Sequence, residues 1–142
     1  MQIASQPHVL TDMVLTIGAD DYEAHVSSCS LVPSTDAPRI RWKGLTPSAE
    51  FTATGTPVTT WDLVLNACQD WETANSLSQY LYDHAGTVTA VELSPQRGVG
   101  KTFTFEVTIV PGQVGGDVDA VAITPVTMPV EGTPAMTPWS AV

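Results

Sequence analysis

The strongest structural signal in this sequence lies in residues 70–93, which read DWETANSLSQYLYDHAGTVTAVEL. At about 100° per residue, the apolar side chains of its first half fall on one stripe, which we expect to pack in the core: Trp71, Ala74, Leu77, Leu81 and Ala85. Asp70 is expected to cap a helix of about 14 residues, and Gly86 stands where a left-handed residue can end it. No other segment has this period, so the sequence predicts a single helix.

Most of the remaining chain favours β-strands. The 142 residues include 19 threonines and 17 valines, which are favoured in strands, while 11 prolines and ten glycines supply turns. Alternating residues predict strands at 13–17, 22–32, 39–43, 49–54, 57–67, 87–93, 101–110 and 118–127, with a loop at 33–38. We therefore predict one domain over residues 1–142, a β-sandwich or flattened barrel of about eight strands with one flanking helix. An extended N-terminal arm (about 1–11) and a proline-rich C-terminal tail (about 128–142) would flank it.

Three of these segments show the alternation clearly. The segment 101–110 places four apolar residues on one face: Phe103, Phe105, Val107 and Ile109. The segment 57–67 does the same with Trp61, Leu63, Leu65 and Ala67. In the segment 39–43, Arg39, Arg41 and Lys43 share one face, and Ile40 and Trp42 share the other.

The charge of the chain limits its partners. Fifteen acidic residues and five basic residues give a net charge of −10. Proteins that grip nucleic acid or anionic membranes use clustered Lys and Arg, so neither partner is expected to bind here. The N-terminal residues lack the charged and apolar regions of a signal peptide, and no apolar run approaches membrane-spanning length. We therefore expect a soluble protein made in a cytoplasm.

No catalytic or metal-binding pattern is visible in the sequence. Residues 98–102, GVGKT, resemble the end of a phosphate-binding P-loop, but Pro95 replaces the required glycine and a strand follows instead of a helix. The three histidines have no metal-ligand spacing, and no activated nucleophile can be recognised. Cys29 and Cys68 are expected to be free buried thiols, with a single disulfide as the alternative. We predict no enzyme, no metal and no cofactor.

The basic residues are concentrated in two short segments, 39–43 and 97–101, whereas acidic residues occur throughout the chain. One interpretation is that the charge only provides solubility. The other is self-assembly, in which basic segments contact the acidic surface of identical neighbours. The candidate subunit-interface residues are Arg39, Arg41, Trp42, Lys43, Arg97 and Lys101.

Residues 61–86, with the pattern W…L…YL…G, resemble the major tail proteins of long-tailed actinobacterial phages. The segment 126–134, VTMPVEGTP, is also similar to the ending common in that family. The resemblance implies a tail-tube fold, which is also found in contractile injection systems and type VI secretion. It implies hexameric rings that stack into a hollow tube in the virion tail, assembled in the host cytoplasm beside tape-measure and terminator proteins. DNA would pass through the lumen at ejection without specific binding.

In such a tube, the polar faces of the inner strands would line the lumen, where an acidic wall repels DNA. The lumen candidates from strand alternation are Glu23, Glu50, Thr52, Glu92, Thr104, Glu106 and Thr108. Residues 33–48 would form the long loop that reaches a neighbouring ring. Two alternatives remain open: a tail terminator or other head–tail joining protein, and an immunoglobulin-like surface binding module.

Overall fold

The computed structural model describes residues 1–139 and is mostly β, as predicted. Its elements are β1 (Val14–Ile17), β2 (Asp20–Asp21), a 3-10 turn η1 (Glu23–His25), β3 (Val26–Asp36), β4 (Arg39–Lys43), β5 (Glu50–Thr54), β6 (Val58–Cys68), α1 (Leu77–Asp83), β7 (Val88–Ser94), β8 (Lys101–Thr108) and β9 (Ile123–Pro138). Seven strands form one antiparallel sheet in the order β2-β1-β7-β8-β9-β6-β3, and β4 and β5 form a separate two-stranded sheet. The single predicted α-helix is confirmed within these residues.

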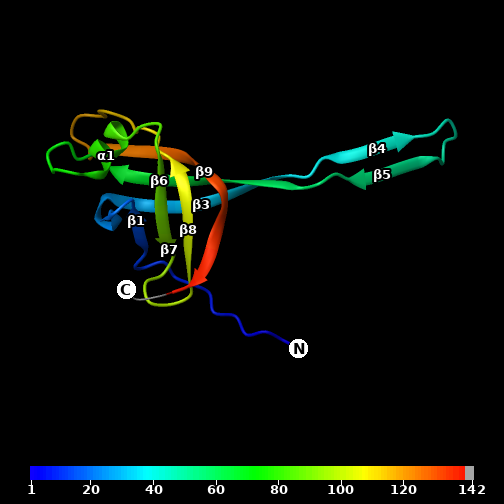
Figure 1. The fold of residues 1–142 in the computed structure, drawn as a ribbon, viewed down its shortest axis with the longest axis horizontal. Helices are drawn as coiled ribbons and strands as arrows, with labels where there is room; N and C mark the ends of the chain where they lie inside the picture. Colours follow the sequence, from blue (N-terminus) through cyan, green and yellow to red (C-terminus); the bar gives the residue numbers. More distant parts are fainter. Residues whose placement is uncertain (140–142) are drawn as a thin grey trace.

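The long strand β9 joins the two halves of the sheet. Its first part, Ile123–Pro129, pairs with β6, and its second part, Val130–Pro138, pairs with β8. Figure 1 shows β9 turning sharply, so that β3 and β6 cross β7 and β8 as in orthogonal sheet packing. A register shift opposite Thr104–Glu106, together with Gly132 at φ +73°, accompanies this turn. The two halves therefore face one another, but among the described residues the edge strands β2 and β3 do not pair to close a barrel.

The core lies between these two halves, and strand alternation predicted it correctly. Leu63, Leu65 and Ala67 of β6 are at most 2% exposed. Phe105 and Val107 of β8 are also buried, whereas the threonines and glutamate between the apolar positions of that strand face outward. The other buried apolar side chains are Leu15, Ile17, Tyr22, Leu77, Leu81, Val91, Leu93, Ile109, Val126 and Met128.

The helix is shorter than predicted. It begins at Leu77, with the Ser76 hydroxyl as its N-cap, and not at Asp70. The Asp70 carboxylate instead accepts hydrogen bonds from the backbone amides of Glu72 and Thr73, which forms a separate turn. Asn75, at φ +61°, then interrupts any continuous helix.

The shorter helix changes which residues pack in the core. Leu77 and Leu81 are buried as predicted. Trp71, Ala74 and Ala85 are exposed in the isolated chain and lie outside the helix, so their predicted place on its buried stripe is wrong. Gly86 does have a positive φ, +87°, but it stands beyond the C-cap residue His84.

Two proline-containing segments predicted as a loop and a tail are strands. β3 continues through Pro33 to Asp36, and β9 continues to Pro138. β3 is an edge strand, and among residues 1–139 each part of β9 pairs with only one neighbour. Strands tolerate proline where one side needs no ladder hydrogen bond, which explains both departures. Both strands also begin later than predicted, because residues 23–25 form η1 and β9 begins only at Ile123.

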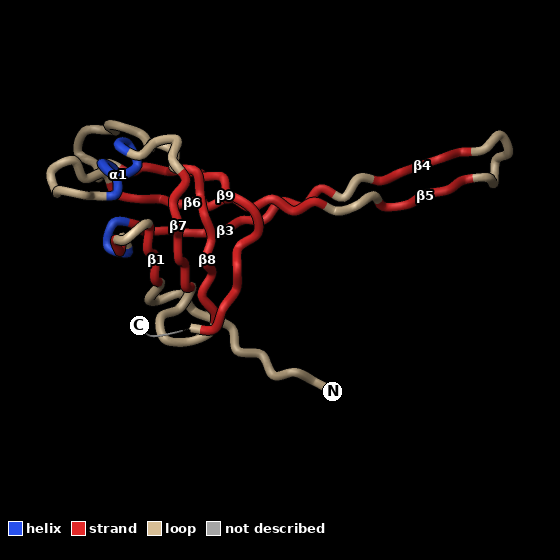
Figure 2. Tube along the Cα trace, in the orientation of Figure 1, coloured by secondary structure: helices blue, strands red, loops and turns tan. Residues whose placement is uncertain are grey.

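The hairpin arm, residues 36–58, projects from one end of the body (Figures 1 and 2). It continues the β3–β6 pair, whose last partners are Asp36 and Val58, and it contains β4 and β5 close to their predicted positions. The structure thus replaces the predicted loop at 33–48 with a paired hairpin. No helix within residues 1–139 is both long and apolar enough to cross a membrane.

Candidate assembly surfaces

One face of the sheet gathers four of the predicted lumen residues. Glu92 of β7 lies opposite Thr104 of β8, while Glu106 of β8 lies opposite Glu131 of β9. The three glutamates are exposed, and the Thr108 hydroxyl donates a hydrogen bond of 2.8 Å to the Glu131 carboxylate. We call Glu92, Thr104, Glu106, Thr108 and Glu131 the acidic sheet face. Strand alternation predicted all of these except Glu131, which lies in the segment predicted as a tail.

The acidic sheet face has the electrostatics of a repulsive wall. Glu106 and Glu131 are direct cross-strand partners, an arrangement that destabilises a sheet when both carry the same charge. Lys101, at the start of β8, alternates onto the opposite side of that strand. The other basic side chains lie in the hairpin arm and at Arg97, in the loop between β7 and β8. Negative charge is therefore not balanced locally on this face.

The other lumen candidates lie elsewhere. Glu23 is in η1, where its carboxylate is 3.3 Å from the Arg97 guanidinium. Glu50 and Thr52 are on β5 in the hairpin arm. The structure therefore does not bring these three residues together with the acidic sheet face in one chain.

The hairpin arm has two chemically different faces. Trp42 pairs with Phe51 and Ile40 pairs with Ala53, so an apolar row forms on one side. Trp42, Phe51 and Ile40 are 62%, 58% and 55% exposed. The opposite side carries the three predicted basic residues, Arg39, Arg41 and Lys43. An isolated two-stranded hairpin is only marginally stable in water, and its exposed aromatic side chains are typical of a surface awaiting a partner.

The basic residues differ in how their charge is used. Within the arm, the Arg41 guanidinium forms an ion pair with Glu50 at 2.6 Å. Arg97 forms ion pairs with Asp12 at 3.1 Å and with Glu23 at 3.3 Å, and its backbone amide donates to the carbonyl of Asp12. Arg97 thus holds the base of the N-terminal segment against the loop between β7 and β8. Lys101 is exposed.

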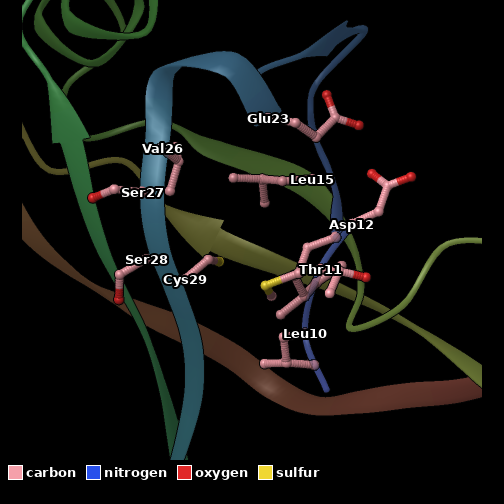
Figure 3. Close-up of a pocket in the computed structure, with 11 residues that line it drawn as sticks. Leu10, Thr11, Asp12, Leu15, Glu23, Val26, Ser27, Ser28 and Cys29 are labelled. Atoms are coloured by element: carbon pink, nitrogen blue, oxygen red, sulfur yellow. The ribbon is translucent and has the colours of Figure 1, made fainter. Parts of the chain in front are cut away.

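A pocket of about 260 Å³ opens between β1 and β3. Figure 3 shows Cys29 on the side of β3 that faces Leu15 and Leu10, while the hydroxyls of Ser27 and Ser28 point away. Burial raises the pKa of the Cys29 thiol to about 12, so the thiol stays protonated and unreactive at neutral pH. Cys29 and Cys68 are both free and half-buried.

Within residues 1–139 no group of His, Cys, Asp or Glu side chains is arranged to hold a metal ion.

The end of the body opposite the arm is organised by Gln69, which no sequence pattern singles out. Its side-chain amide donates to the carbonyls of Gly115 (2.8 Å) and Ile123 (2.9 Å), and its carbonyl accepts from the Gly115 amide. These bonds hold the loop at 110–122 beside the turn that precedes α1. The loop, the turn and the helix nevertheless leave apolar side chains exposed: Trp71, Tyr82, Val114, Val118 and Val121.

Comparisons with known proteins identify the fold. No protein-family model matches this sequence, and no curated protein matches it either. Among solved structures, a chain from the virion of a native gene transfer agent particle is 16% identical, with a TM-score of 0.59 over 89% of this chain and 95% of the other. A chain from the tail of an empty gene transfer agent particle, computed with helical refinement and C6 symmetry, is 13% identical, with a TM-score of 0.54 over 80% and 82%.

A chain from a third structure, that of the sheath/tube terminator of an extracellular contractile injection system in the extended state, is 14% identical, with a TM-score of 0.57 over 95% of this chain and 99% of the other. At such low identity, the three likenesses show that this chain has a fold found in virion tails and injection systems. The narrower resemblance to actinobacterial major tail proteins is not tested by them and stays a prediction.

Proposed function

We propose that this protein is a structural subunit of a phage or phage-like tail, without catalytic activity. It polymerises as stacked hexameric rings into a hollow tube through which DNA is ejected. The observation that carries this proposal is the fold likeness to a chain of the gene transfer agent tail. The paired arm that projects from the body supports it, because a projecting hairpin with exposed aromatic residues suits a subunit that contacts neighbours.

In this proposal, the acidic sheet face lines the lumen. Repeated around a ring, Glu92, Glu106 and Glu131 form a wall of like charge to DNA, and the threonines between them add no positive charge. The wall keeps the polyanion from adhering during passage. DNA is therefore cargo that passes without specific binding, and the protein partners are other copies, the tape-measure protein and the terminator. The protein works in the virion tail and assembles in the host cytoplasm.

The hairpin arm contacts the neighbouring ring. Trp42, Phe51 and Ile40 are exposed in the isolated chain and become buried on assembly, which compensates for the marginal stability of a lone hairpin. Its basic residues contact acidic groups of the next subunit.

A terminator is the second candidate, and the fold likeness to a chain in the structure of an injection-system sheath/tube terminator supports it. A terminator forms a single ring that caps a tube, whereas a tube subunit stacks without limit. An immunoglobulin-like surface module would instead be a stable monomer. The assembly state separates the three candidates.

Negative-stain electron microscopy of the purified protein, concentrated at moderate salt, tests the proposal. We expect hollow tubes of varied length. Single rings that never stack would favour the terminator, and monomers at every concentration and salt would contradict both tail roles.

The matched control removes the arm alone. Asp36 and Val58 are direct cross-strand partners, so an Asn-Gly turn can replace residues 37–57 without disturbing the body. This variant is expected to fold and stay monomeric.

A further inference from the structure

The two ends of the molecule carry opposite charge. Residues 36–58 contain three of the five basic residues and only two of the fifteen acidic ones, so the arm is the positive part of a strongly negative chain. Residues 69–87 and 110–122, at the far end of the body, contain five acidic residues and no Lys or Arg. The acidic residues are Asp70, Glu72, Asp83, Asp117 and Asp119.

Exposed apolar side chains are also found at both ends of the molecule. The arm exposes Ile40, Trp42 and Phe51 on the face opposite its basic residues. The far end exposes a second apolar set beside its acidic groups: Trp71, Tyr82, Val114, Val118 and Val121. We call this set, with Glu72, Asp83 and Asp117, the helix-end surface. Each surface thus combines exposed apolar side chains with a net charge of one sign, positive in the arm and negative at the helix end, and the two signs are complementary.

The arm cannot reach the helix-end surface of its own chain. β6 runs from the base of the arm at Val58 to Cys68, just before Gln69, so its 11 residues separate the two surfaces. At about 3.3 Å per residue, this separation is roughly 36 Å. The arm also points away from α1 (Figure 1). Any contact between the two surfaces must therefore join two copies.

We propose that the arm of one copy docks on the helix-end surface of the next copy, with its apolar row against the exposed aromatic and valine side chains. The long basic side chains on the other face of the narrow hairpin extend past its edge toward the carboxylates around that surface. The contact is heterologous, because different surfaces of identical chains meet, and such contacts extend without limit unless they close into a ring. This inference rests on the proposed function, in which the arm links successive rings, and it names the acceptor.

A charge-reversal complementation experiment tests the proposal. The arm-reversed variant carries Arg39→Glu and Lys43→Glu and keeps the Arg41–Glu50 ion pair. The end-reversed variant carries three exposed substitutions: Glu72→Lys, Asp83→Lys and Asp117→Lys. Asp70 is kept because it accepts the turn hydrogen bonds, and Asp119 is kept because its φ is +67°. Circular dichroism and urea denaturation establish that both variants fold.

Self-association is measured by sedimentation velocity over a concentration series, with electron microscopy of the same samples. Each variant alone places like charges at the contact, so each should require at least roughly tenfold more protein to assemble than the wild type. A one-to-one mixture supplies matched pairs at both contacts, and we expect it to restore assembly. The gain on mixing should shrink as salt is raised.

The possible results separate this inference from the proposed function. The helix-end surface is not the acceptor if either variant alone assembles like the wild type, or if the mixture of two impaired variants stays unassembled. In both cases, tubes formed by the wild type would still support the proposed tail function. If the wild type itself never self-associates, the proposed function fails and this inference fails with it.

Discussion

The acidic sheet face makes a quantitative prediction about stability, because it keeps two like charges directly opposite each other. Glu106 and Glu131 are cross-strand partners on an exposed face. Two carboxylates about 6 Å apart repel by about 0.7 kcal/mol in water. Screening leaves about 0.6 kcal/mol of this repulsion at 0.01 M salt and about 0.1 kcal/mol at 1 M. Glu106→Gln should therefore raise the free energy of unfolding by about 0.5 kcal/mol at low salt.

Urea denaturation is the appropriate assay, since urea is uncharged and leaves the ionic strength free to vary. The gain from Glu106→Gln should disappear in a Glu131→Gln background, where the substituted amide's carbonyl can still accept the hydrogen bond from Thr108. The matched control is Glu92→Gln, because the cross-strand neighbours of Glu92 are Thr16 and Thr104 rather than a carboxylate. A coupling energy that is zero, favourable or independent of salt would refute the electrostatic argument.

Three shorter predictions concern the helix, the turn at Asp70 and the lumen wall. Leu81→Ala should lower the free energy of unfolding in urea by about 2–5 kcal/mol, because Leu81 is 1% exposed in the core, whereas Trp71→Ala should cost less than about 1 kcal/mol. Hydrogen bonds from the Thr73 hydroxyl and amide lower the pKa of Asp70. The Asp70 carboxylate therefore stabilises the fold above its unfolded pKa, and this stabilisation is lost as the pH falls through the lowered pKa of the folded state. Asp70→Asn should remove this contribution to the loss of stability in acid, as measured by thermal melts over a pH series. Glu92→Lys should leave tube assembly intact by electron microscopy but reduce plaque formation in a phage that carries the variant, because a cation on the lumen wall holds DNA.

For each of these three predictions, one result would contradict it. Equal losses for the Leu81 and Trp71 variants would mean that the short helix is not the packed element. An unchanged acid dependence in Asp70→Asn would remove the proposed turn contribution. Normal plaques from Glu92→Lys, and from the same change at Glu106, would argue that this face is not the lumen wall.

Strand alternation predicted the core because it depends only on which side of a strand is buried. Phe105 and Val107, and likewise Leu63 and Leu65, were on the predicted apolar faces and are buried. The start of the helix was harder to predict, because Asp70 and Ser76 are both suitable N-cap residues and the apolar residues keep helical spacing across both. Asn75 in the left-handed region favours the second start, and a periodic pattern does not reveal a single backbone angle.

The proline-rich ending misled the sequence interpretation for a topological reason. Prolines argue against a central strand, yet β9 is central in the sheet order while each of its parts pairs on one side only. Pairing of this kind is a property of the whole sheet, so local sequence did not indicate it. The same error concealed Glu131 and therefore the like-charge pair of the acidic sheet face. The helix-end surface was missed because Gln69 acts through backbone carbonyls far away in the chain.

The division of β9 between two partners also shapes the way in which the chain folds. Each half of the sheet is completed by a different part of one strand, so neither half has its full hydrogen-bond ladder until β9, the last strand of the chain, is in place. The pairs that close the sheet join residues far apart in sequence, such as Asp62 with Pro129 and Val14 with Ser94. Such closures are slow, and until they form, the unpaired edge of β6 is open to strands of other chains. Productive folding and misassembly thus compete for the same edge, and β9 must pair with β6 before a foreign strand does.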